Sequence, residues 1–270
     1  MENNNSVLEY YESYDEDGRI DRDSLEFIRT KDIVLRNLPK NPIKIIDLCG
    51  ASGHYAYWLA EMGHEVHLMD LTPKHIDQAK NNQSKYKAKL ASMTIGDARF
   101  LPYENETFDM VLLMGALYHL QENEDRLKCL REAYRILKNG GTAIFAYISR
   151  YASMMDGFKY GYINDPVFCQ IMDNDILTGR HNNPENTEGY FTNAYFHTKN
   201  EVYNELITAK FSDIIFYGVE GFASLISNSD EYLRDENKLK KLLHYLRLVE
   251  QDMEITGISP HWLAVCKKQS

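Results

Sequence analysis

The sequence has no apolar run long enough to cross a bilayer, no closely spaced cysteine pair and no recognisable targeting segment. The run MVLLMGALY has nine residues, whereas a membrane-spanning helix needs about 20. The four cysteines include no C-x-x-C pair, so neither a zinc framework nor a disulfide scaffold is indicated. The opening MENNNSVLEYYESYDED is polar and acidic, unlike a secretory or transit peptide. We therefore expect a reduced, cytoplasmic protein without a metal site.

Basic residues are too few to balance the acidic ones. The 270 residues include 30 Lys and Arg against 40 Asp and Glu, a formal charge of −10 at pH 7. A field of that sign repels phosphate backbones and anionic lipid, so neither nucleic acid nor a membrane is an expected partner. A hydrophobic content of 44% suits one large domain, with or without a smaller cover. The 19 tyrosines are an excess that these arguments leave unexplained.

Apolar runs alternate with helical patterns through the middle of the chain. The expected strands there are IKIIDLCG, HEVHLMDLTP, MTIGD, FDMVLLMG and TAIFAYIS. The expected helices lie at HYAYWLAEMG, at 73–89 and at 124–138, the last ended by Asn139-Gly140-Gly141. Strands that alternate with helices of this length predict a parallel sheet with helices on both faces. Right-handed crossovers then give a doubly wound α/β fold.

The two ends of the chain and residues 150–200 follow other patterns. Residues 7–38 read as one or two helices, and 150–200 have only a weak helical pattern. After that segment we expect a helix at EVYNELITAKF, a strand at SDIIFYGVEG, a long helix at 230–254 and a strand at HWLAVCKK. The expected parts are an N-terminal helical lid (1–38), a cofactor-binding core (39–149), an inserted cap (150–204) and the rest of the core (205–270).

Three loops at the carboxyl ends of the expected strands carry chemistry suited to a nucleotide-like ligand, which doubly wound sheets bind there. In the loop from Asp47 to Gly53, small residues let the backbone approach a ligand, and the following helix offers free N–H groups. Asp70 ends the second strand and suits the two hydroxyls of a ribose. Asp97, in Gly96-Asp97-Ala98, can accept from the exocyclic amine of adenine.

The three loops together resemble the class I S-adenosylmethionine-dependent methyltransferases, closest to the small-molecule branch called type 11 or 25. The resemblance covers about residues 40–150, and HWLAVCKK resembles the family's closing antiparallel strand. It implies a Rossmann-like, mostly parallel seven-stranded sheet and S-adenosyl-L-methionine as cofactor. The sequence departs from the family's D-x-G-x-G-x-G loop, because Cys49 and Ala51 replace the first two glycines and only Gly53 remains.

The resemblance also implies the cofactor-binding residues. These are Tyr14, Arg29, Asp47, Cys49, Gly50, Ala51, Gly53, Asp70, Leu71, Asp97, Ala98, Met114 and Gly115. Tyr14 and Arg29 are included because a helical lid could bring them to the methionine carboxylate, which an arginine fork matches. A nicotinamide dinucleotide site is the rival hypothesis, but it requires G-x-G-x-x-G, and DLCGASGHY does not supply that pattern.

Methyl transfer from a sulfonium requires alignment of the acceptor and exclusion of water more than a catalytic dyad. His119 follows the fourth strand and is the first candidate for a general base, with Tyr118 as a wall or hydrogen-bond donor. Packing against the next helix is the alternative role for that histidine. Tyr11, Tyr190, Tyr195 and His197 are candidate acceptor-binding residues, although aromatic clusters often serve simple packing.

The sequence thus predicts an enzyme that methylates a small-molecule acceptor, whose identity and oligomeric state it does not specify. An RNA or protein methyltransferase is one alternative, which the charge of −10 and the absence of a basic aromatic stripe disfavour. A non-catalytic S-adenosylmethionine-binding regulatory protein is the other, because Cys49 and Ala51 alter the cofactor loop.

Overall fold

The computed structural model describes residues 8, 10–11, 24–183, 187, 189–226 and 229–269, with backbone alone at 229–230. Seven strands form its central sheet: β1 (Lys44–Leu48), β2 (Glu65–Asp70), β3 (Ser92–Ile95), β4 (Phe108–Leu113), β5 (Leu137–Ile148), β8 (Phe211–Gly218) and β9 (His261–Lys268). Their order is β3-β2-β1-β4-β5-β9-β8. β1 to β5 pair in parallel, whereas β9 is antiparallel to both of its neighbours. This confirms the mostly parallel seven-stranded sheet.

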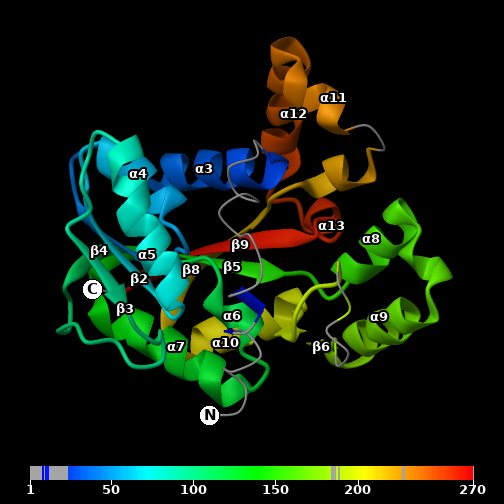
Figure 1. Ribbon diagram of the computed structural model, residues 1–270, viewed down its shortest axis with the longest axis horizontal. Helices are drawn as coiled ribbons and strands as arrows, with labels where there is room; N and C mark the ends of the chain where they lie inside the picture. The colour runs from blue at the N-terminus through cyan, green and yellow to red at the C-terminus, as the bar shows by residue number, and fades with distance from the viewer. Residues whose placement is uncertain are drawn as a thin grey trace.

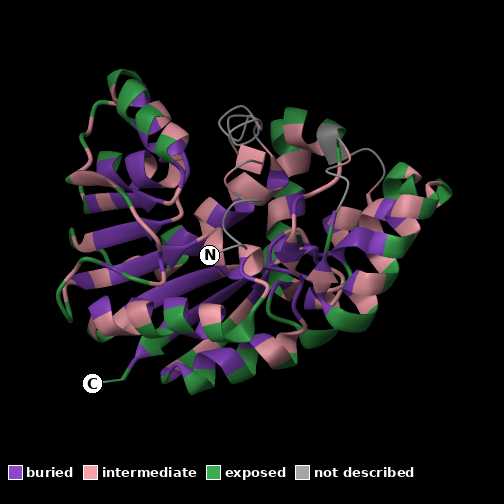
Figure 2. Cartoon of the chain, turned by 60° about the horizontal axis from the view of Figure 1, so that its bottom comes forward, coloured by how far each residue is buried: buried purple, intermediate pink, exposed green. Residues whose placement is uncertain are grey.

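Helices cover both faces of the sheet (Figure 1). On one face lie α3 (Leu25–Asn37), α4 (His54–Glu61) and α5 (Pro73–Asn82); on the other lie α7 (Asn123–Ile136) and α10 (Lys199–Thr208). Successive residues of a strand point to opposite faces. Ile45 therefore packs in the core cluster of α3, and Ile46 packs in that of α7. In Figure 2 the buried strands lie between helices whose outward faces are exposed.

The prediction of one long helix at 230–254 is wrong. The chain instead forms α11 (Ser229–Arg234), α12 (Glu236–Val249) and α13 (Met253–Thr256). Asp235 accepts hydrogen bonds from the amides of Asn237 and Lys238, and Asp252 accepts one from Glu254. Each aspartate thus caps a new helix, since a side-chain oxygen satisfies amides that have no partner within the helix. Apolar spacing continues across both breaks and gave no sign of them.

Two further boundaries differ from expectation. Helix α5 ends at Asn82 and is followed by the short 3₁₀ helix η1 (Gln83–Lys85), so the helix expected at 73–89 is too long. Helix α7 ends at Ile136, and Asn139-Gly140-Gly141 lie within β5, where the pairing with β4 shifts register. The glycines therefore form a bulge inside the strand, at which Gly140 has φ +75°, and do not end the helix.

The described residues of 152–195, which we call the α8–β7 segment, lie at one end of the molecule (Figure 1). They form α8 (Ala152–Tyr160), η2 (Tyr162–Asn164), α9 (Pro166–Thr178) and the two-stranded sheet of β6 (Arg180–His181) and β7 (Ala194–Tyr195). Gly161, at φ +78°, reverses the chain after α8, and Asp165 caps α9. This segment is more helical than its sequence indicated. Among the described residues, no helix is both long and apolar enough to cross a membrane.

Candidate functional site

A cavity of about 860 Å³ lies at the carboxyl ends of the parallel strands. Its lining includes Cys49 after β1, Asp70 at the end of β2, Asp97 after β3, Met114 after β4 and Ile148 at the end of β5. The order of strands reverses between β1 and β4, and loops that diverge at such a point leave a crevice for a ligand. The sheet therefore brings the three predicted loops to one cavity.

The loop after β1 keeps a glycine-like backbone without the glycines. Cys49 has φ +56°, Ala51 has φ +48° and Gly53 has φ +87°. A side chain in this left-handed region costs about 1–2 kcal/mol per residue. Burial also raises the pKa of the Cys49 thiol well above its usual value, so the thiol stays protonated. Cys49 therefore packs as a small residue at the edge of the cavity.

Gly50 has no side chain, and this lets the loop pack closely against Asp47 of β1 and Leu68 of β2. A Cβ at Gly50 would lie 2.4 Å from Asp47 Oδ2 and 2.6 Å from Leu68 Cδ1. Both contacts are far inside van der Waals distance, so a side chain here would displace the loop. The backbone thus forms a narrow cradle at the cavity, directly over the carboxylate of Asp47.

Asp47 is fully buried, and neither of its oxygens has a hydrogen-bond partner in the described structure. Burial, together with the charge of Asp70, raises its pKa to about 7. A buried carboxylate without a partner is costly, and a cationic ligand group nearby would favour its ionised form. Asp47 does not itself line the cavity; it lies beneath Gly50.

Asp70 connects the ends of β1 and β2. Its Oδ2 accepts from the amide of Ala51 at 3.0 Å, and its Oδ1 accepts from the amide of Thr72 at 2.8 Å. The ring Nδ1 of His75 lies 3.1 Å from Oδ1. A carboxylate has about four acceptor positions, so these three contacts hold the side chain still and leave one position on Oδ2. That position suits one ribose hydroxyl.

Asp97 lines the cavity but is already engaged by a cation. Arg99 Nε lies 3.1 Å from both carboxylate oxygens, and Arg99 Nη2 donates to Oδ2 at 2.6 Å. Arg99 also pairs with Asp125 on α7. The guanidinium and the amide of Arg99, which donates to Oδ1 at 2.9 Å, fix the orientation of Asp97 at the cavity.

The short helix α6 (Ala116–His119) carries Tyr118 and His119, which both line the cavity. Tyr118 donates to the carbonyl of Met114 at 2.8 Å, and His119 Nε2 lies 2.8 Å from the hydroxyl of Tyr11. Burial lowers the pKa of His119 to about 4. The imidazole is therefore neutral at pH 7. Tyr11 reaches this site from a part of the chain far away in sequence.

The structure brings most of the remaining predicted residues to the cavity. Those that line it are Cys49, Gly50, Ala51, Leu71, Ala98, Met114, Gly115, Tyr11 and Tyr190. Gly53 shapes the loop without lining the cavity. Tyr195 and His197 lie away from it: Tyr195 packs under Arg126, and His197 lies between Tyr147 and Tyr195. Tyr14 lies outside the described residues.

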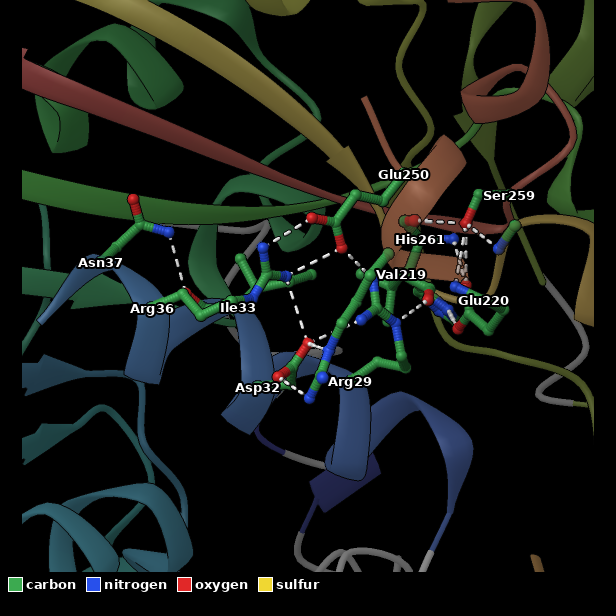
Figure 3. A network of polar contacts seen from close by, with 12 residues as sticks. Arg29, Asp32, Ile33, Arg36, Asn37, Val219, Glu220, Glu250, Ser259 and His261 are labelled. Carbon is green, nitrogen blue, oxygen red and sulfur yellow. Dashed lines mark hydrogen bonds and ion pairs between the residues drawn. The ribbon is translucent and has the colours of Figure 1, made fainter. Parts of the chain in front are cut away.

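Arg29 is not at the cavity either (Figure 3). Its Nε donates to the carbonyl of Val219, its Nη1 donates to Asp32, and its Nη2 donates to Glu250 at 2.5 Å. The guanidinium is fully buried and has its donors engaged within the protein. The expectation that it reaches a cofactor carboxylate is therefore wrong, because tertiary contacts already use the fork.

Sequence reasoning missed several polar residues of the lining. They are Glu26, His75, Asp156, His181 and His261. Only His75 had a local signal, since it stands five residues after Asp70 at the start of a helix. The others come from α3, α8, β6 and β9, which are distant in sequence, and no motif marks them.

The cradle at Gly50, the buried carboxylate of Asp47 and the acceptors Asp70 and Asp97 fit a ligand with a cationic end, a ribose and an adenine. Together with a sheet whose β9 alone runs antiparallel, these features are similar to those of the class I S-adenosylmethionine-dependent methyltransferases. Residues 46–145 match the profile of the family described as methyltransferase domain. S-adenosylmethionine is the cofactor of that class.

Known proteins agree with this assignment. A glycine/sarcosine N-methyltransferase of Aphanothece halophytica is 26% identical over 182 residues, which cover 65% of this chain and 68% of that protein. A ubiquinone/menaquinone biosynthesis C-methyltransferase of Cereibacter sphaeroides is 26% identical over 143 residues, which cover 51% of this chain and 56% of that protein. The structure of an S-adenosylmethionine-dependent methyltransferase from Mesorhizobium loti shares the fold, with a TM-score of 0.59, 15% identity and coverage of 92% and 99%.

Proposed function

We propose that this protein transfers the methyl group of S-adenosylmethionine to a small-molecule acceptor. The observation that carries the proposal is the meeting of Asp70, Asp97 and the Gly50 cradle at one cavity of about 860 Å³. That volume lies within the range of small-molecule sites. One relative above is named for glycine and sarcosine and the other for ubiquinone and menaquinone biosynthesis, which supports a small-molecule acceptor.

In this proposal the cofactor supplies an electrophilic methyl group, and the protein holds the reactants and excludes water. Asp70 accepts from a ribose hydroxyl, Asp97 accepts from the adenine amine, and the Gly50 cradle takes the amino-acid end above Asp47. The acceptor occupies the remainder of the cavity. Alignment of this kind lowers the barrier by making the reaction effectively intramolecular.

Two parts of the chain outside the central sheet also line the cavity and are suited to cover it. Tyr10 and Tyr11 line it from the N-terminal part of the chain, and the α8–β7 segment contributes a second wall that includes Tyr160, Tyr162 and Tyr190. We propose that the N-terminal residues act as a lid and the α8–β7 segment as a cap on the acceptor side. Many of the tyrosines then serve the acceptor pocket.

Calorimetric titration with S-adenosylmethionine and S-adenosylhomocysteine tests the site. We expect both to bind, and Asp70→Asn to weaken S-adenosylhomocysteine about 10–100-fold, since a hydrogen bond to a charged group contributes about 1.5–3 kcal/mol. Asp77→Asn on the exposed face of α5 is the matched control and keeps the wild-type affinity. No heat at millimolar ligand, or equal effects of the two variants, contradicts the proposal. Turnover with any acceptor separates an enzyme from a binding protein.

A further inference from the structure

All fully charged side chains that line the described part of the cavity are carboxylates. They are Glu26, Asp70, Asp97 and Asp156, and no lysine or arginine of the described residues joins them. Arg99 neutralises Asp97 from outside the lining, and backbone amides hold Asp70. Walls of low dielectric focus such a field. The rest of the cavity therefore attracts cations and repels phosphate and carboxylate groups.

Asp156 on α8 is the lining carboxylate whose charge is offset by the fewest contacts. Burial raises its pKa, against the opposing effects of His261 and Lys159, and no hydrogen bond or ion pair connects it to another described residue. Glu220 raises its pKa further. Glu220, Glu26 and His261 place their ligand atoms within 4.8 Å of one another. His261 Nδ1 lies 2.5 Å from Glu220 Oε1, so a single imidazole stands against the three carboxylates Asp156, Glu26 and Glu220 at this end of the cavity.

His181 on β6 is a second cavity residue with a buried polar atom that lacks a hydrogen-bond partner among the described residues. It is 2% exposed, and its Nδ1 lies 2.8 Å from Oδ2 of the fully buried Asp175. Ser153 donates to the same oxygen at 2.5 Å. A carboxylate acceptor holds the imidazole proton on Nδ1, so Nε2 keeps a lone pair. Nε2 has no hydrogen-bond partner in the described structure, and a ligand N–H would supply one.

Aromatic rings complete this side of the cavity. Tyr160, Tyr162, Phe168, Tyr190 and Phe191 line it. The ring centroid of Phe191 lies 5.5 Å from that of His119 and 6.0 Å from that of His181, so His181 belongs to the same region as α6. The face of an aromatic ring attracts a cation by about 0.5–2 kcal/mol, which adds to the effect of the carboxylates.

We propose that the methyl acceptor is an amine, which Asp156 and its acidic neighbours attract as an ammonium ion and whose N–H proton passes to His181 Nε2. The inference rests on the proposed methyltransferase function. In the reaction a C–N bond forms while the C–S bond of the sulfonium breaks, and the sulfur keeps the electron pair. The ammonium nitrogen first gives one proton to His181 Nε2, because only the neutral amine has a lone pair with which to attack, and Asp175 stabilises the resulting imidazolium. The product is the methylated ammonium ion. Acceptors whose only charge is a phosphate or carboxylate are excluded.

The binding test compares probes of similar size on the complex with S-adenosylhomocysteine. A panel of primary amines that includes phenethylamine is titrated by calorimetry against the neutral 3-phenylpropanol and the anionic 3-phenylpropionate. We expect at least one amine to bind and the anion not to bind. Asp156→Asn should weaken the amine about tenfold, whereas the matched change Asp173→Asn, at an exposed position of α9, should leave its affinity unchanged.

The catalytic test follows labelled methyl transfer to the best-bound amine. In His181→Asn the side-chain amide replaces Nδ1 toward Asp175 but nothing replaces Nε2. We expect kcat to fall at least tenfold, with the affinity for S-adenosylhomocysteine unchanged and the KM for the amine changed less than kcat. His181→Gln places a polar atom near Nε2 and should recover amine affinity better than His181→Asn, without recovering kcat.

The outcomes separate this inference from the function on which it rests. Failure of S-adenosylhomocysteine to bind removes the methyltransferase proposal itself. Binding of S-adenosylhomocysteine with no amine bound, with the anion bound as tightly, or with Asp156→Asn unaffected overturns the amine assignment alone. Amine binding that EDTA abolishes also overturns it, because the cluster of Glu26, Glu220 and His261 would then act through a metal ion. An unchanged kcat in His181→Asn overturns its role as proton acceptor.

Discussion

Arg29 of α3 and Glu250, the residue that follows α12, form an ion pair of 2.5 Å in which both side chains are almost completely buried. Arg36 donates to both oxygens of the same carboxylate, as Figure 3 shows. The pair connects a helix near the N-terminus with the C-terminal part of the core. Because Phe27 and Thr30 of α3 line the cavity, the pair also positions one of its walls.

Replacement of Glu250 by Gln should lower the free energy of unfolding by about 3 kcal/mol, since loss of one partner leaves a buried charge without compensation. Asp32 remains near Arg29, which keeps the effect at the lower end of the usual range. Urea denaturation measures the change. Glu236→Gln, at an exposed ion pair with Lys240, serves as the control and should cost less than about 0.5 kcal/mol. A loss below 1 kcal/mol in Glu250→Gln contradicts the prediction.

Local sequence patterns were sufficient to predict the sheet and the acidic residues at the carboxyl ends of its strands. The strand in IKIIDL has apolar residues on both faces, Ile45 and Ile46 among them, because both faces are buried. Asp47 follows from its place near the strand end. The same reasoning located Asp70 and Asp97, because parallel strands bring their carboxyl ends to one edge. These residues needed no long-range information.

Other residues depend on contacts that no local pattern records. The fork of Arg29 suits a ligand carboxylate as well as it suits Glu250, which lies 221 residues away, and only the fold decides between them. His181 was missed for a different reason: Asp175 lies only six residues away, but no motif marks the pair, and only the fold brings it to the cavity. His197 was predicted at the site, but its ring is fully buried between two tyrosines.

Gly50→Ala should abolish binding of S-adenosylhomocysteine while the protein stays folded. The added Cβ meets Asp47 and Leu68 at 2.4–2.6 Å, so the loop must shift away from the sheet and out of the cradle. Calorimetry measures the affinity and circular dichroism the fold. Gly257→Ala, whose Cβ would meet its nearest neighbour at 3.4 Å, is the control. Wild-type affinity in Gly50→Ala would show that the cradle is not part of the site.

Ala51→Gly should raise the stability by up to about 1 kcal/mol. Glycine relieves the strain of φ +48°, worth about 1–2 kcal/mol, but part of this gain is lost to the greater freedom of the unfolded chain. Ala51→Val should destabilise the protein, since a β-branched residue tolerates this conformation least. Thermal unfolding of the three proteins gives the comparison. We expect the melting temperature to fall from the glycine variant through the wild type to the valine variant, and the reverse order would refute the assigned backbone conformation.

The dependence of the free energy of unfolding on pH should show the raised pKa of Asp47. Its carboxyl has a pKa of about 7 in the folded protein and an ordinary pKa near 4 in the unfolded chain. The folded state therefore binds the extra proton between these values, and this group stabilises the protein progressively as the pH falls from 8 to 5. The difference in stability between wild type and Asp47→Asn isolates the effect, which reaches about 1.4 kcal/mol per pH unit. A difference that stays constant with pH contradicts it.

His119 should stay neutral throughout the physiological range, because burial lowers its pKa to about 4 and its Nε2 contacts the hydroxyl of Tyr11. The ring nitrogen shifts of His119, assigned with His119→Asn, should not change between pH 5.5 and 8. Tyr11→Phe removes the hydroxyl and should change the Nε2 shift without making the ring titrate in that range, since burial is the larger cause of the low pKa. Titration of His119 in the wild type near pH 6.5 would show instead that solvent reaches the ring, and would make it available as a base beside His181.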